Sequence, residues 1–180
     1  MNTKSTWILS FLVFACLAAL ASAGTISIPL VTVGDPRNVV DPTTGYGAVP
    51  YVYEIGEYDV TTAQYTAFLN AVATAGDPYG LYSTGMGTDL HAVGITLSSS
   101  GAALYAVNGN GNVPVLDVSW GDAARFVSWL ANGRPTGPEG THTTEAGSYT
   151  LDGARTNTAL SARLQTLSKP PYVITPGELP

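Results

Sequence analysis

The sequence predicts a single α+β domain with two helices, short antiparallel strands and much irregular structure. Three observations support this prediction. Two segments have the three- and four-residue spacing of amphipathic helices, several short runs are rich in β-branched residues, and segments rich in Gly, Ser and Thr separate them. A chain of 180 residues suits one domain.

The first 23 residues have the features of a cleavable signal peptide. Lys4 supplies positive charge, residues 7–20 are almost wholly apolar, and Ala21-Ser22-Ala23 forms a small-residue cleavage site. The apolar run of about 14 residues is shorter than the roughly 20 that span a bilayer. We therefore expect cleavage before Gly24 and export to the periplasm, the cell surface or the medium.

Cysteine content and charge limit the possible functions. Cys16 is the only cysteine and lies in the leader, so the mature chain has no disulfide, thiolate nucleophile or sulfur metal ligand. A lipoprotein leader ending at Cys16 is an alternative, although Phe14 is bulkier than such sites favour. The formal net charge of −6, without a basic cluster, disfavours nucleic acid and, after leader cleavage, membrane surfaces as partners.

Two strands are predicted at the start of the mature chain. Residues 25–33 are β-branched and apolar, and Pro29 favours an edge position. Residues 50–58 alternate large apolar residues with others, which indicates a strand with one buried face.

A helix is predicted next, over residues 63–75, with Thr61 or Thr62 as its N-cap and Gly76 at its end. Its apolar face comprises Tyr65, Phe68, Leu69 and Val72. Residues 77–100 are predicted to form a loop, and residues 103–107 a short strand that ends at the Asn-Gly-Asn-Gly turn of 108–111.

The second helix has the clearest signal. Ser119 is the predicted N-cap and Asp122 completes a capping box, while Gly133 ends the helix. Its predicted buried face comprises Ala123, Phe126, Val127 and Leu130. Residues 134–153 are polar and rich in turns, with at best a short strand at 149–151.

Two segments together resemble the formylglycine-generating, or sulfatase-modifying factor, family. In the first, a strand leads through Asp59-Val60-Thr61 into the helix that carries Gln64-Tyr65. The second has Pro114-Val115, then Val118-Ser119-Trp120, Asp122-Ala123 and Trp129-Leu130. The order and spacing of both segments agree with the family. Residues 77–82 are similar to a secreted bacterial branch of it.

The resemblance implies a C-type-lectin-like fold for residues 24–153, followed by a divergent tail over 154–180. Catalytic members oxidise a sulfatase cysteine to formylglycine, using oxygen and a copper ion that two cysteines hold. Those cysteines and the family's calcium-binding region have no counterpart here, so we expect a member that is truncated at the C-terminus and lacks copper and calcium ligands. Thiolates select monovalent copper, and Cys16 leaves with the leader.

The polar and aromatic candidates all have simple structural interpretations. His91 and His142 lie in predicted loops without a third ligand at metal spacing, and the clustered histidines of the related iron enzymes are absent. Glu139, Glu145 and Asp152 lack EF-hand spacing. We interpret the remaining candidates as core, dipole and capping residues of the second helix: Trp120 and Trp129, Asp117 and Asp122, and Ser119. We therefore assign no catalytic, cofactor-binding or metal-binding residue.

Three hypotheses about function remain open. The chain is an exported, non-catalytic family member, a secreted lectin-like module that binds glycan or protein, or the product of a non-functional gene fragment. Enzymatic activity would need cysteines from a partner or from a further C-terminal region.

Overall fold

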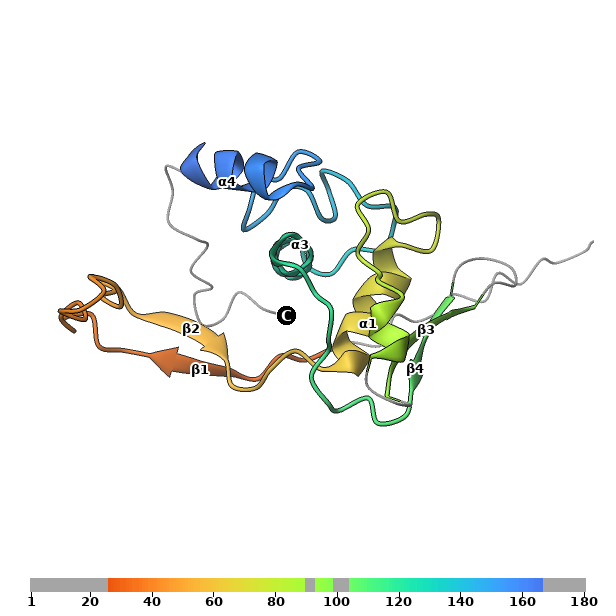
Figure 1. Cartoon of the computed structure of the whole chain (residues 1–180), viewed down its shortest axis with the longest axis horizontal. Helices are drawn as coiled ribbons and strands as arrows, with labels where there is room; N and C mark the ends of the chain where they lie inside the picture. The colour runs from red at the N-terminus through yellow and green to blue at the C-terminus, as the bar shows by residue number, and fades with distance from the viewer. Residues whose placement is uncertain (1–25, 90–92, 99–103, 167–180) are drawn as a thin grey trace, which may run out of the picture.

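The computed structural model describes residues 26–89, 93–98 and 104–166, and in these ranges it has two hairpins and four helices (Figure 1). The elements, in chain order, are β1 (Leu30–Val33), β2 (Tyr53–Gly56), α1 (Thr62–Val72), α2 (Gly85–Thr88), β3 (Gly94–Ser98), β4 (Leu104–Asn108), α3 (Trp120–Ala131) and α4 (Asn157–Thr166). Both sheets are two-stranded and antiparallel, which confirms the α+β class. The predicted signal peptide lies outside the described residues. Within them, no helix is long and apolar enough to cross a membrane.

Strands β1 and β2, which lie within the two predicted strands, pair to form the arm on the left of Figure 1, but the predicted burial of one face of residues 50–58 is wrong. Val31 lies opposite Ile55 and Val33 opposite Tyr53, so these four side chains share one face of the arm. Val31 and Ile55 are 39% and 51% exposed. The arm therefore presents an apolar face to solvent.

Helix α1 is the centre of the hydrophobic core. Its predicted apolar face is fully buried, and Tyr65 and Phe68 form an aromatic cluster with Phe126 and Trp129 of α3. On its other side, α1 meets the β3–β4 hairpin, where Asn70 accepts the backbone N–H of Tyr105 at 2.9 Å and donates to its carbonyl at 2.7 Å. The helix therefore joins the hairpin to α3.

The prediction of one loop over residues 77–100 is wrong at residues 85–88 and 94–98. Helix α2 and strand β3 lie there, and β3 pairs with the correctly predicted β4. Only Ile95 gives β3 a deeply buried apolar side chain, so the segment has little hydrophobic pattern of its own. Its pairing with a later strand determines its structure.

The end of α3, the burial of Phe126 and the partial burial of Leu130 agree with the prediction, but the rest of the predicted buried face does not. Ala123 is exposed and Val127 is 40% exposed, whereas Arg125, Ser128 and Trp129 are buried. Two layers cover the helix: α1 on one side, and the irregular segment 134–156 with α4 on the other (Figure 1). A periodicity analysis that treats Arg and Ser as solvent-facing therefore finds only part of the buried face.

Helix α4 lies in the predicted tail, where the sequence analysis expects no element. Its Leu160 packs with Ala124 of α3 and with Leu151 and Ala154 in a second small core. Residues 149–151 form no strand; Leu151 is buried from irregular backbone. The fold thus has a fourth helix that depends on contacts with α3.

Candidate functional site

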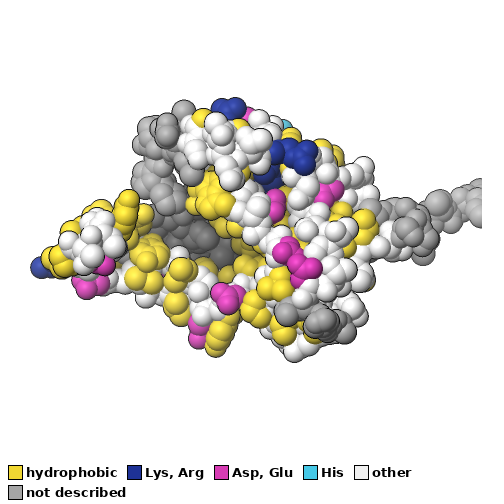
Figure 2. Space-filling view, in the orientation of Figure 1, with side chains coloured by type: hydrophobic (Ala, Val, Ile, Leu, Met, Phe, Trp, Pro, Cys, Tyr) yellow, Lys and Arg dark blue, Asp and Glu magenta, His cyan; other side chains and the backbone are white. Residues whose placement is uncertain are grey.

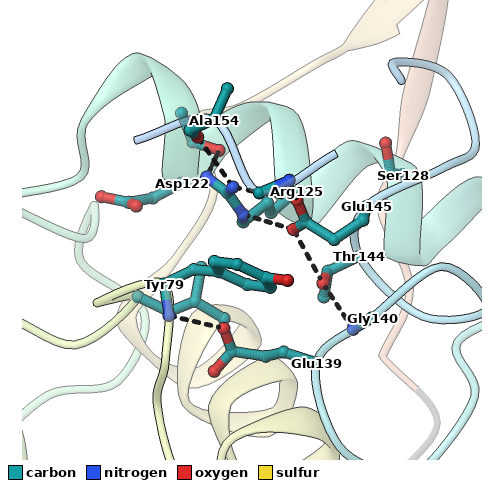
Figure 3. Close-up of polar contacts among 12 residues, drawn as sticks. Tyr79, Asp122, Arg125, Ser128, Glu139, Gly140, Thr144, Glu145 and Ala154 are labelled. Atoms are coloured by element: carbon teal, nitrogen blue, oxygen red, sulfur yellow. Dashed lines mark hydrogen bonds and ion pairs between the residues drawn. The ribbon is translucent and has the colours of Figure 1, made fainter. Parts of the chain in front are cut away.

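A buried arginine organises the polar interior of the molecule (Figure 3). Arg125 is 1% exposed and forms a bidentate pair with Glu145, with Nε–Oε1 and Nη2–Oε2 distances of 2.6 and 3.1 Å. Nη2 also donates to the carbonyl of Ala154 at 2.9 Å, and the guanidinium carbon lies 4.5 Å from the centre of the Tyr79 ring. Fork geometry and an aromatic face are what favour arginine over lysine at such a position.

Further contacts hold Glu145 in place. Its Oε2 accepts the backbone N–H of Gly153 at 2.7 Å, and its Oε1 accepts the Thr144 hydroxyl at 3.3 Å. The network joins α3, the segment that follows it and the segment after α1. Every charge in this group has a partner, which is the pattern of a structural ion pair.

Glu139 lies under Tyr79 and is 9% exposed (Figure 3). Its Oε2 accepts the backbone N–H of Tyr79 at 3.2 Å, whereas Oε1 is buried without a hydrogen-bond partner. Burial and the adjacent Asp77 carboxylate raise the pKa of Glu139 to about 8. Arg125, Tyr79 and this property of Glu139 are missed by the sequence analysis, because their partners lie far apart in the chain.

The two tryptophans of α3 have different environments. Trp129 is 2% exposed and donates to the carbonyl of Pro135 at 2.9 Å, which confirms its interpretation as a core residue. The same interpretation is wrong for Trp120, which is 44% exposed and stacks edge-on with Tyr149. The side chain at position N1 of α3 thus contacts Tyr149 of the covering segment but remains exposed to solvent.

The predicted capping residues behave as expected, but Asp117 does not. Ser119 accepts the N–H of Asp122 at 3.2 Å, and the Asp122 carboxylate accepts the N–H of Ser119 at 2.9 Å. Burial raises the pKa of Asp122, although the hydrogen bonds that Ser119 makes with its carboxylate lower it. Asp117 has a φ of 54° and lies beside Gly85 and Asp89 rather than at the helix start, and loss of hydration and the Asp89 charge raise its pKa.

The carboxylates considered as cation ligands have separate protein partners. Glu145 pairs with Arg125, and Asp152 lies 3.0 Å from Arg163. Among the described residues no three His, Cys, Asp or Glu side chains are grouped as metal ligands. His142 is exposed, and His91 lies outside the described residues.

A groove of about 480 Å³ lies where the chain enters α1. Its lining includes Ile28, Pro29, Tyr58, Asp59 and Asn112. Tyr58 is 69% exposed. The side chains of Asp59 and Asn112 are exposed and make no hydrogen bond within the described part of the chain. The groove therefore combines an open aromatic ring with free polar groups.

Comparison with known protein families decides the classification. Residues 32–167 match the family model described as the sulfatase-modifying factor enzyme 1-like domain. The chain belongs to this family. No curated protein and no solved structure matches it. The match covers both segments that carry the resemblance in the sequence.

The residues of this family member do not fit the copper ion that the resemblance implies. Monovalent copper selects soft thiolate or thioether ligands, and the chain has one cysteine, Cys16, which precedes the matched domain. Met86, a thioether in the described region, is 3% exposed within the hydrophobic core. No step of a copper reaction can therefore be assigned to these residues.

Proposed function

We propose that this chain is an exported, non-catalytic member of the sulfatase-modifying factor family with a C-type-lectin-like fold. The position of Cys16 carries the proposal. Cleavage before Gly24 removes this residue, so the exported chain has no thiolate with which to hold copper. The polar interior supports the proposal, because the Arg125–Glu145 pair is saturated with protein contacts and lies away from solvent.

The proposal is tested with the full chain, expressed with its leader in a secreting bacterial host. The protein from the exported fraction is incubated with copper(I), oxygen and a cysteine peptide of the sulfatase type, and the peptide mass is followed. A copper-binding family member serves as the positive control. We expect the peptide cysteine to stay unmodified. Conversion to formylglycine in proportion to the amount of this protein would overturn the proposal.

The groove beside α1 favours a second candidate, binding of a neutral carbohydrate. An exposed tyrosine ring matches the apolar face of a pyranose, and a carboxylate and an amide match its hydroxyl groups. Tyr58, Asp59 and Asn112 supply these groups. The acidic chain disfavours anionic sugars and polyphosphates.

A neutral-glycan array with the exported protein tests this candidate. We expect binding that Tyr58→Ala and Asp59→Asn each reduce at least about tenfold, equivalent to about 1.4 kcal/mol. Tyr46→Ala is the control, because Tyr46 is an equally exposed tyrosine on the loop between β1 and β2. Binding that Tyr58→Ala leaves unchanged, binding of peptides only, or no binding at all would contradict it.

A further inference from the structure

Two segments that are distant in sequence meet at a pair of carboxyl groups. Asp77, just after α1, accepts the backbone N–H of Leu81 at 2.7 Å on one oxygen and that of Tyr82 at 2.9 Å on the other. Glu139, in the segment after α3, accepts the N–H of Tyr79 on Oε2. Both carboxylates therefore accept backbone N–H groups of the same short segment, residues 79–82, and the charge of Asp77 acts on Glu139.

One carboxyl oxygen of Glu139 is left without a hydrogen bond in this arrangement. Glu139 Oε1 is buried without a hydrogen-bond partner, and such atoms are costly. If both acids were ionised, two negative charges would also face each other in a shielded place. A proton on Oε1 removes both costs, because it turns the orphan acceptor into a donor toward Asp77, whose oxygens both act as acceptors.

We propose that Asp77 and Glu139 share one proton, which Glu139 donates, and that this hydrogen bond fastens residues 77–82 to residues 139–145 in a pH-dependent clasp. Proton loss leaves two carboxylates that repel each other, so the clasp opens. Tyr79 lies between the two acids in the chain and supports Arg125, so opening also loosens the site around the buried arginine.

The groups around Glu139 support its protonated state. Burial is the main cause of its raised pKa of about 8, and the charge of Asp77 adds to it. Arg125 has the opposite effect, but its charge is already paired with Glu145. The two phenols that face the acids, from α1 and β4, are neutral because burial raises the pKa of Tyr65 far above its usual range and that of Tyr105 to about 12.

The sign of the pH dependence follows from linkage. The ordinary pKa of glutamic acid is 4.5, so an unfolded chain releases the proton near that pH, whereas the folded chain keeps it until about pH 8. The contribution of the clasp to stability is therefore complete below pH 4.5. It falls as the pH rises toward 8 and is lost above that value.

Glu139→Gln in the full chain is the sharpest test. A glutamine amide donates a hydrogen bond to Asp77 at every pH, so the variant imitates the protonated acid. We expect its thermal midpoint to equal that of the wild type at about pH 5 and to exceed it at about pH 9. Glu57→Gln is the control, since Glu57 is an exposed carboxylate, and it should keep the wild-type profile. Equal pH profiles for Glu139→Gln and the wild type would overturn the proposal.

A spectroscopic measurement on the wild type decides the case if the variant does not fold. Infrared difference spectra should show the carbonyl band of a buried protonated carboxylic acid at neutral pH, which disappears with a midpoint near pH 8. Absence of that band at neutral pH would overturn the proposal.

Discussion

At the scale of single residues, Arg125 has the largest consequences for the fold. It is a charged side chain on the buried face of α3, and Glu145 and Ala154 of the segment that follows the helix supply its partners. A buried ion pair of this kind contributes little net stability compared with a well-packed apolar substitute. Removing one partner, however, is strongly destabilising, because it leaves the other charge buried and unpaired. The pair therefore specifies how α3 faces its neighbours.

Removing one member of the pair should show this asymmetry. Glu145→Gln leaves the guanidinium charge buried without compensation, and we expect the free energy of unfolding to fall by about 3 kcal/mol in urea titrations. Asp152→Asn removes an exposed carboxylate 3.0 Å from Arg163, and should cost less than about 1 kcal/mol. Similar losses in both variants would contradict the structural role of the buried pair.

Gly94 is a second residue of consequence, because there is no space for a side chain at this position. Its φ is 158°, and an added Cβ would lie 1.8 Å from the carbonyl oxygen of Met86. We expect Gly94→Ala to cost at least about 3 kcal/mol, because backbone on both sides must move. Gly140→Ala, where the nearest atom would lie 4.0 Å away, should be nearly neutral in the same urea titrations. A stable Gly94→Ala variant would show that α2 and β3 are packed more loosely than described.

At the scale of elements, the starts of α1 and α3 could be predicted from the sequence, to within one residue for α1. Thr61 and Ser119 are the N-caps, and each forms a reciprocal capping box with the residue three positions on. Such signals are local, so a sequence shows them. The face of α3 could not be predicted, because burial of Arg125 depends on Glu145, which lies 20 residues later.

The caps give a quantitative prediction. Thr61→Ala should lower the free energy of unfolding by about 1 kcal/mol, since the backbone N–H of Gln64 loses its acceptor. Thr84, which precedes α2, makes no capping hydrogen bond with its side chain. Thr84→Ala should therefore change stability by less than about 0.5 kcal/mol. Equal effects of the two substitutions on chemical unfolding would rule out the capping contribution.

Elements without a strong pattern were missed for a related reason. Strand β3 pairs with β4, and α4 contributes Leu160 to a small core that α3 and residues 151–154 complete. Each gains its stability from tertiary contacts rather than from its own amphipathic pattern. The candidate site could not be predicted from the sequence for the same reason, because residues from the separate segments after α1 and α3 form it together.

At the scale of the whole molecule, Figure 2 shows hydrophobic side chains along the β1–β2 arm, while the acidic residues are dispersed. Eight of the large exposed apolar residues belong to this arm or flank it: Val31, Val39, Val40, Tyr46, Tyr51, Val52, Ile55 and Tyr58. These residues make the arm and its flanks the part of the described chain with the most exposed large apolar side chains.

The proposed export makes a prediction about the whole chain. Protein collected from outside the cytoplasm should begin at Gly24, as read by N-terminal sequencing or intact mass. Ala23→Asp should block this processing, since the cleavage site requires small residues. An exported chain that retains Met1, or one that begins at Cys16 with a lipid, would contradict the predicted cleavage.

The central claim is that the exported chain lacks the ligands for copper chemistry. Native mass spectrometry of the exported protein with copper(I), in the presence of a competing thiol chelator, tests this claim most directly. The account predicts the mass of the metal-free chain at every copper concentration. One tightly held copper ion per chain would contradict it.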